Sequence, residues 1–310
     1  MDLYRVGNSN QLDYNMDSKH GKVLPSNEDR IDSGLDSLKD DEYNVIVNEM
    51  ERLNVANTEA NNEYCSEPWQ QEKTEDGDTL LHLAIIHEAK DYATRMIEHS
   101  RNHPFLNTQN HQRQTPLHLA VIMDQPQIVE RLLKAGCDPR LVDECGNTAL
   151  HIACKKGSLH CFSVLTQGCT QQLPSILTSH NYSGHNCLHL VSIHGFLSLV
   201  ERLIELGADL NAQEQCNGRT PLHLAVDLQN LELVQLLVTK GANVNSLTYG
   251  GYTPYHLTYG RQNMAIRQQL YELTDHELRE LPESEAEESD EESMSEDDML
   301  YDDFLWMGQK

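Results

Sequence analysis

Two serine hydroxyls, those of Ser33 and Ser37, lie four residues apart in the stretch RIDSGLDSLKD. An aspartate directly precedes each serine, and Gly34 leaves the backbone between them free to bend. Phosphorylation would add about −1.5 to −2 charge to each hydroxyl at neutral pH. Two phosphates at this spacing make a compact anionic group of the kind that an arginine-rich pocket binds bidentately. The stretch therefore predicts a phosphorylation-dependent recognition site in a segment without a hydrophobic pattern.

Six histidines recur in another short pattern, TPLHLA and its variants, 33 to 38 residues apart, at His82, His118, His151, His189, His223 and His256. Zinc needs three or four ligands about 2.0–2.3 Å from one point, whereas residues one repeat apart stack along a chain of repeats without converging. We interpret the histidines as structural hydrogen-bonding residues; a metal protein or enzyme built on them is the alternative. The sequence has no G-x-S-x-G, Walker loop or convincing Cys–His pair. We therefore predict no enzyme activity and no cofactor.

The same pattern predicts the helices that position the histidines. Thr115 can cap a helix by accepting a hydrogen bond from the amide of His118, and Pro116 suits the first helical turn. Asn186 replaces the threonine in the fourth copy and can cap equally well. Segments such as LVERLIELGAD then place apolar residues at i, i+3, i+4 and i+7, and a glycine ends each of them. Each repeat is thus predicted to form a turn and two antiparallel helices.

The period and the sequences TPLHLA and GADLNAQ…NGRTPLH resemble the ankyrin repeat. The resemblance implies an all-α solenoid of six repeats with hairpin fingers along one edge, in which each repeat packs only on its neighbours. We expect this domain at residues 73–280, with repeats at about 73–109, 110–142, 143–180, 181–214, 215–247 and 248–280. Disordered acidic arms are expected at 1–72, which holds the paired serines, and at 281–310, a PEST-like tail.

The formal net charge of −26 is concentrated in these arms. Residues 1–72 carry a net charge of −10, and residues 280–303 contain 13 acids and no Lys or Arg. Such segments are too polar to bury a core. The negative balance argues against direct nucleic-acid binding and favours a basic partner. No apolar run is long enough to span a membrane, and the first residues lack a signal-peptide pattern, so we expect a soluble intracellular protein without disulfides.

Beside the repeats, DSGLDS resembles the D-S-G-x-x-S phosphodegron read by the β-TrCP subunit of an SCF ubiquitin ligase. From DRIDSGLDSLKDDEY through SEPWQQEKTEDGDTLLHLAIIHEAK to LPESEAEESDEES and LYDD, the chain resembles the inhibitors of NF-κB, the IκB family. The resemblance implies a cytoplasmic inhibitor, shuttling to the nucleus, that masks the nuclear-localisation and DNA-binding surfaces of a Rel/NF-κB dimer. It also implies that IκB kinase phosphorylates Ser33 and Ser37, and that ubiquitination and proteasomal degradation release the dimer.

The degron makes Lys19 and Lys22 the expected ubiquitin acceptors; two ordinary solvated lysines are the alternative. The family usually has two adjacent lysines there, whereas here His20 and Gly21 separate them, which leaves open which one is preferred. Tyr43 follows DDE and resembles the family's tyrosine phosphosite, with a plain exposed tyrosine as the alternative.

The tail has serines with an acid three residues later, which is the pattern that casein kinase II reads, at Ser284, Ser289, Ser293 and Ser295. This pattern is permissive, since most acidic serine-bearing tails show it. The tail's charge also makes it a plausible phosphate mimic that competes with DNA for a basic surface, an effect that salt should weaken. A merely solubilising tail is the alternative.

Two segments have the apolar spacing of nuclear export signals, one at Val45, Val47, Met50 and Leu53, and one at Ile266, Leu270, Leu273 and Leu278. The second also fits the buried helix of the last repeat. Asn211 and Asn245 occupy the finger position where ankyrin asparagines are hydroxylated, and they are also suited to bridge turns by hydrogen bonds. An ankyrin adaptor whose phosphodegron serves a different client is the alternative to the inhibitor as a whole.

Overall fold

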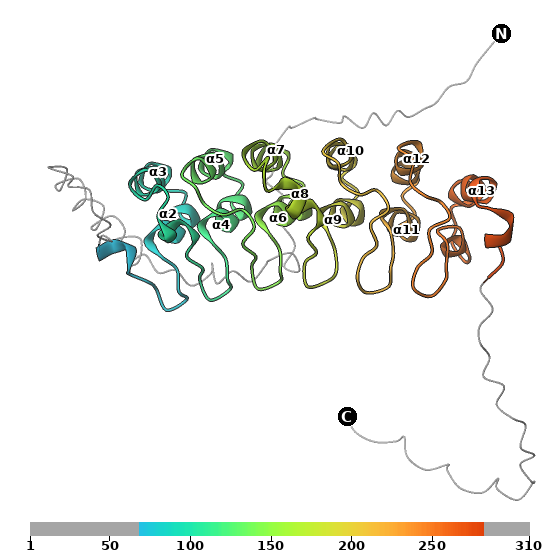
Figure 1. Ribbon diagram of the computed structural model, residues 1–310, viewed down its shortest axis with the longest axis horizontal. Coiled ribbons are helices and arrows are strands. Elements are labelled where there is room, and N and C mark those ends of the chain that lie inside the picture. The colour runs from blue at the N-terminus through green and yellow to red at the C-terminus, as the bar shows by residue number, and fades with distance from the viewer. Residues whose placement is uncertain (1–67, 282–310) are drawn as a thin grey trace, which may run out of the picture.

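The computed structural model describes residues 68–281, which form one elongated stack of short helices (Figure 1). The elements in chain order are η2 (Pro68–Gln70), α2 (Leu80–Ile86), α3 (Lys90–His99), η3 (Pro104–Asn107), α4 (Pro116–Ile122), α5 (Pro126–Lys134), α6 (Ala149–Lys156), α7 (Leu159–Gly168), α8 (Leu173–Thr178), α9 (Cys187–His194), α10 (Leu197–Glu205), α11 (Pro221–Asp227), α12 (Leu231–Thr239), η4 (His256–Thr258), α13 (Met264–Leu273) and η5 (His276–Leu278).

The helices lie in two rows (Figure 1). The inner row contains α2, α4, α6, α9, α11 and η4, and the outer row contains α3, α5, α7, α10, α12 and α13. Loops between repeats project from the inner row as parallel fingers (Figure 1). Within residues 68–281 there is no strand, only an isolated bridge between Lys73 and Thr79. The prediction of an all-α ankyrin solenoid is confirmed for this part of the chain.

The capping chemistry expected from the sequence starts the inner helices. The hydroxyl of Thr115 accepts from the amide of His118, and Pro116 is the first residue of α4. Asn186 performs the same role for α9 through its side-chain oxygen. The histidine completes a capping box, because its Nδ1 accepts the backbone N–H of the cap residue at 3.0–3.3 Å in each of the six copies.

The same histidines connect one repeat to the next. The Nε2 atoms of the first five lie 3.0–3.2 Å from a backbone oxygen of the following finger or turn, namely those of Gln114, Asn147, Ser179, Ala212 and Tyr252. Since Nδ1 accepts, Nε2 must carry the proton, so each ring is held as one neutral tautomer. We call this series the histidine ladder. Both ring nitrogens of the first five histidines thus have a hydrogen-bond partner, in agreement with a structural role.

Two repeats depart from the regular pattern. The interval of 38 residues between His151 and His189 accommodates the additional helix α8, which follows α7 in the third repeat. In the sixth repeat the inner helix is reduced to the 3₁₀ turn η4, where the sequence predicted a full helix. Gly260 adopts a left-handed conformation at φ +73° soon after this turn, and no further repeat packs there to extend a helix.

Apolar side chains between neighbouring helices form one continuous core along the stack. Phe162 is among the largest fully buried side chains and lies in the middle of the stack on α7. At the N-terminal end, Trp69 is only 4% exposed and packs edge-on against Phe105, with ring centroids 5.1 Å apart. Trp69 therefore belongs to the packed stack although it precedes residue 73, the boundary expected from the repeat pattern.

A second series of contacts joins the fingers. The amides of His111, Glu144, Tyr182, Gln215 and Tyr249 each donate to a carbonyl of the preceding finger at 2.9–3.1 Å. This approach leaves no room for a side chain on Gly146, which has φ +76° and where a Cβ would come within 2.8 Å of the backbone nitrogen of Tyr182.

We therefore expect Gly146→Ala to destabilise the chain by about 1–3 kcal/mol, because it adds left-handed strain to a backbone clash. Chemical denaturation followed by circular dichroism measures the effect. Gly207→Ala is the matched control: it shares the left-handed φ, at +89°, but has nothing within 4 Å of the added atom. Equal losses in the two variants would contradict the role of the close finger contact.

Candidate functional site

Most of the predicted modification sites lie outside the described residues 68–281, namely Lys19, Lys22, Ser33, Ser37, Tyr43, Ser284, Ser289, Ser293 and Ser295. The first export pattern, Val45, Val47, Met50 and Leu53, also lies outside them. These assignments remain predictions.

The two finger asparagines are in the described part. The side-chain oxygen of Asn211 accepts the amide of Asn243 in the next repeat at 2.8 Å. Asn245 repeats this contact with the amide of Asp275 at 3.1 Å, and its amide group donates to the Asp275 carboxylate at 2.8 Å. Both asparagines therefore bridge turns, as their second interpretation expected. Their hydroxylation remains a prediction.

The second export pattern is divided between the interior and the surface. Ile266 and Leu270 on α13 are fully buried, whereas Leu273 is 45% exposed and Leu278 is half-buried on η5. A receptor could reach all of these side chains only if α13 detached from the stack. The geometry corresponds to the buried-helix alternative stated for this segment.

The ladder histidines are electrostatically unlike surface histidines. Burial lowers the pKa of His82, His151, His189 and His223 to about 4. Burial also lowers the pKa of His118, partly opposed by the charge of Asp143 and the carbonyl of Asn147. With both nitrogens occupied, these neutral rings have no lone pair to offer a metal ion. Among residues 68–281 no group of three His, Cys, Asp or Glu side chains is arranged to hold one.

Five cysteines of the described region have a raised thiol pKa. Burial raises the pKa of Cys161 and Cys169 to about 11, and the pKa of Cys137 and Cys154 is raised as well. Cys145 is exposed at a finger, but partial burial and the nearby carboxylates of Asp143 and Glu144 raise the pKa of its thiol too. Reactive cysteines require the opposite shift.

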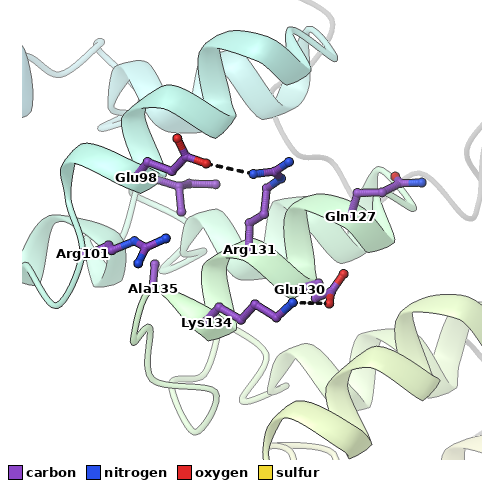
Figure 2. Close-up of a pocket in the computed structure, with 8 residues that line it drawn as sticks. Glu98, Arg101, Gln127, Glu130, Arg131, Lys134 and Ala135 are labelled. Carbon is purple, nitrogen blue, oxygen red and sulfur yellow. Dashed lines mark hydrogen bonds and ion pairs between the residues drawn. The ribbon is translucent and has the colours of Figure 1, made fainter.

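A hollow of about 310 Å³ lies between the outer helices α3 and α5 (Figure 2). Its walls carry two exposed ion pairs, Glu98–Arg131 at 3.0 Å and Glu130–Lys134 at 2.5 Å, as Figure 2 shows. Arg101 points into the same hollow (Figure 2). Solvated pairs of this kind contribute little to stability. The hollow is a charged surface depression, and the polar side chains that line it are all exposed.

Some exposed apolar side chains lie on the fingers and at the ends of the inner helices, whereas others, such as Leu159 and Met264, lie on the outer row. Tyr182 and Tyr249 on the fingers are 67% and 64% exposed, and Leu228 after α11 is 51% exposed. Beside Leu228, Asp227 forms ion pairs with Arg219, at 2.7 Å, and with Arg261 of the last repeat. Aromatic side chains with polar surroundings are typical of protein interfaces. We call the fingers and the inner row the binding face.

No motif of the sequence predicted this face. A signal was available in the aligned fingers, where the second residue of the turn is polar in EQCNG and DECGN but is tyrosine in NYSGH and TYGGY. An exposed tyrosine at a position otherwise polar indicates a contact surface. Its exposure, however, depends on the neighbouring finger and had to be observed.

The described part of the chain has no helix long and apolar enough to cross a lipid bilayer. Comparison with known proteins supplies the family. The ankyrin-repeat family model, which covers three copies per match, fits residues 51–143, 124–214 and 188–270.

Close relatives belong to one particular group of ankyrin-repeat proteins. The chain is 56% identical over 260 residues to NF-kappa-B inhibitor alpha of Mus musculus, covering 83% of this chain and 82% of the relative. It is 54% identical over 269 residues to the Gallus gallus protein of that name, covering 86% and 84%. The solved ankyrin domain of Bcl-3, described as a unique member of the IkappaB protein family, matches with a TM-score of 0.60 and 36% identity, over 66% of this chain and 90% of that domain. The chain belongs to the NF-kappa-B inhibitor alpha family of ankyrin-repeat proteins.

Proposed function

We propose that the chain inhibits Rel/NF-kappa-B transcription factor dimers by covering their nuclear-localisation and DNA-binding surfaces, and so retains them in the cytoplasm. The observation that carries the proposal is the identity to proteins named NF-kappa-B inhibitor alpha, which extends over more than four fifths of the chain. The protein acts as a stoichiometric binding partner and not as an enzyme.

The binding face supports this function through its chemistry. Its exposed tyrosines and leucines provide apolar anchors, and the stack presents them on fingers held rigidly by hydrogen bonds between repeats. A preorganised surface loses less conformational entropy on binding than a mobile one. The first repeats would cover the basic localisation segment of one subunit, and the later repeats would contact the dimerisation domains.

The acidic tail supports competition with DNA. Residues 280–303 hold 13 acids without a Lys or Arg. A segment with this charge can lie against a basic DNA-contacting surface and occupy it in place of phosphate. Because this attraction is electrostatic, salt should weaken it more than the contacts of the binding face.

Regulation would follow from the N-terminal arm. IκB kinase would phosphorylate Ser33 and Ser37, and the phosphorylated stretch would bind the SCF β-TrCP ubiquitin ligase. Ubiquitin on Lys19 or Lys22 would then direct the chain to the proteasome, and the dimer would enter the nucleus. We further propose that the inhibitor itself shuttles between cytoplasm and nucleus.

The test is competition for a Rel dimer bound to labelled DNA, across a salt series, by the full chain and by the full chain with the acids of residues 280–303 neutralised. We expect the full chain to strip the dimer from DNA. Neutralising the tail should weaken stripping about tenfold or more at low salt and much less at high salt, as expected when several charges act together. Failure of both proteins to bind the dimer would contradict the proposal and favour an ankyrin adaptor with another client. Equal stripping at low salt would contradict the role of the tail alone.

A further inference from the structure

Within residues 68–281, no repeat covers the face at the C-terminal end of the stack (Figure 1). In the first five repeats, the third residue after each ladder histidine is fully buried; these residues are Ile85, Val121, Cys154, Ser192 and Val226. The corresponding residue of the last repeat, Tyr259, is 39% exposed. The face therefore carries the positions that would be buried between two repeats.

The histidine ladder is incomplete at this face. In the first five ladder histidines, Nε2 lies 3.0–3.2 Å from a backbone oxygen of the finger or turn that follows. His256 is 5% exposed, and its Nε2 has no hydrogen-bond partner among the described residues. A buried polar atom without a partner costs free energy, which a backbone carbonyl placed on this face would recover.

The composition of the face indicates what would cover it. Tyr255 contacts Tyr259 and Tyr271, with ring centroids 5.4 and 5.7 Å away. The guanidinium of Arg267 lies 5.4 Å from the ring centre of Tyr259, and that of Arg279 lies 4.4 Å from that of Tyr271. The face is therefore both aromatic and cationic.

The position of Arg267 shows that this charge is particular to the end of the stack. Arg267 lies four residues after the N-cap of α13. In each preceding outer helix the residue four positions after the N-cap is a buried apolar one, namely Ala93, Val129, Phe162, Val200 and Val234. A covering segment should accordingly combine aromatic side chains with carboxylates. The stretch DDFLW in the chain's own tail has this combination.

That tail segment, MLYDDFLWM at residues 299–307, has seven apolar or aromatic residues around Asp302 and Asp303. The described residues end at Leu281, directly after the last repeat, which carries the uncovered face. An uncharged flexible chain of the 18 residues from Leu281 to Met299 would have an r.m.s. reach of roughly 20–25 Å, and repulsion between the carboxylates of this segment would extend that reach. A tether of this length keeps the segment at a millimolar-range effective concentration near the face.

We propose that residues 299–307 dock on the C-terminal face of the chain's own ankyrin stack. The segment covers Tyr259 and Tyr271 with its aromatic side chains, sets its two aspartates against Arg267 and Arg279, and supplies a backbone carbonyl to Nε2 of His256. This contact concerns the chain alone, so it does not depend on the proposed inhibition of Rel dimers.

The test uses the fluorescence of Trp306 in the full chain. The chain has two tryptophans, and Trp69→Phe leaves Trp306 as the only one, which can be excited selectively at wavelengths that tyrosine does not absorb. We expect Trp306 to emit at shorter wavelength than free tryptophan and to be protected from acrylamide, independently of protein concentration. Arg267→Glu should lower the ratio of docked to free tail about tenfold, which is roughly 1.4 kcal/mol. Adding Asp303→Lys to Arg267→Glu should restore protection.

Two controls keep the test specific. Arg101→Glu makes the same charge change on an exposed arginine near the other end of the stack and should leave quenching unchanged. Asp303→Lys alone should release the tail while circular dichroism shows the stack intact, since this residue lies outside the repeats.

Three results would overturn the proposal. Trp306 could be quenched like free tryptophan in every variant, which would leave the face as a solvent-adapted end of the solenoid. Protection could appear only at high protein concentration, which would identify a second copy as the occupant. It could appear only after a Rel dimer is added, which would assign the face to the partner.

Discussion

Lowering the pH from 7 toward 4 is expected to destabilise the ankyrin stack by several kcal/mol, because the five ladder histidines with lowered pKa must gain protons on unfolding. In the unfolded chain these side chains titrate near pH 6.5, whereas in the folded stack four of them titrate at about 4. Between these values the unfolded state binds more protons. The contribution of these histidines to the free energy of unfolding is therefore fully present above pH 6.5 and is lost as the pH decreases to about 4.

The structural cause is the dual role of each ring. Protonation of Nδ1 would replace an acceptor by a donor and break the bond from the backbone N–H of the cap residue, which lies 3.1 Å away at Thr115. It would also place a charge in a site where His118 is 1% exposed. One proton thus weakens a helix cap and adds a buried charge at the same interface.

Thermal unfolding across pH 7.5 to 4 measures this dependence, and substitution separates it from the titration of the many carboxylates. His118→Gln keeps a side-chain hydrogen-bonding group but cannot titrate. It should reduce the slope of unfolding free energy against pH between pH 6 and 5, by at most about 1.4 kcal/mol per pH unit, the value for one whole proton. Equal slopes for His118→Gln and the unsubstituted chain would show that the ladder does not control acid stability.

The local part of this arrangement could be predicted from sequence. Thr115, Pro116 and His118 lie within four residues, so capping and helix geometry determine their contacts. The bond from Nε2 of His118 to the carbonyl of Asn147 could not be predicted in the same way, because its partner lies 29 residues along the chain and depends on how the repeats stack. The spacing in the sequence predicted that the histidines stack without converging. It did not predict the hydrogen-bond partner of their second ring nitrogen.

The last repeat shows a different limit of sequence reasoning. TPYHLT predicted an inner helix, and the structure has the 3₁₀ turn η4. The capping contact at Thr253 is present, since Nδ1 of His256 accepts the backbone N–H of Thr253 at 3.0 Å. Each of the other inner helices packs against a following repeat, which stabilises its full length. Within the described residues, no repeat follows η4. Helical stability in short segments comes mostly from tertiary packing, so the outcome depends on a neighbour that the pattern of a single repeat does not describe.

Phe162→Ala, in the middle of the stack, is expected to reduce stability by about 3–5 kcal/mol, since it removes a large buried ring and leaves a cavity. Phe162 is 1% exposed on α7, between the second and fourth outer helices of the described stack, α5 and α10. Each repeat packs only on its neighbours, so loss of one central interface should uncouple the two ends. We therefore expect the variant to unfold in two transitions.

The two tryptophans allow this uncoupling to be observed. In a Trp306→Phe background, emission comes only from Trp69, which packs on Phe105 at the N-terminal end, while far-ultraviolet circular dichroism reports on every helix. In urea, the dichroism of Phe162→Ala should change at lower denaturant concentration than the Trp69 emission. Phe162→Leu, which keeps much of the apolar volume, should cost less and keep the two signals closer together. If both signals of Phe162→Ala shift in parallel and remain coincident, the stack unfolds as a single cooperative unit, and the histidine and finger contacts couple repeats beyond their immediate neighbours.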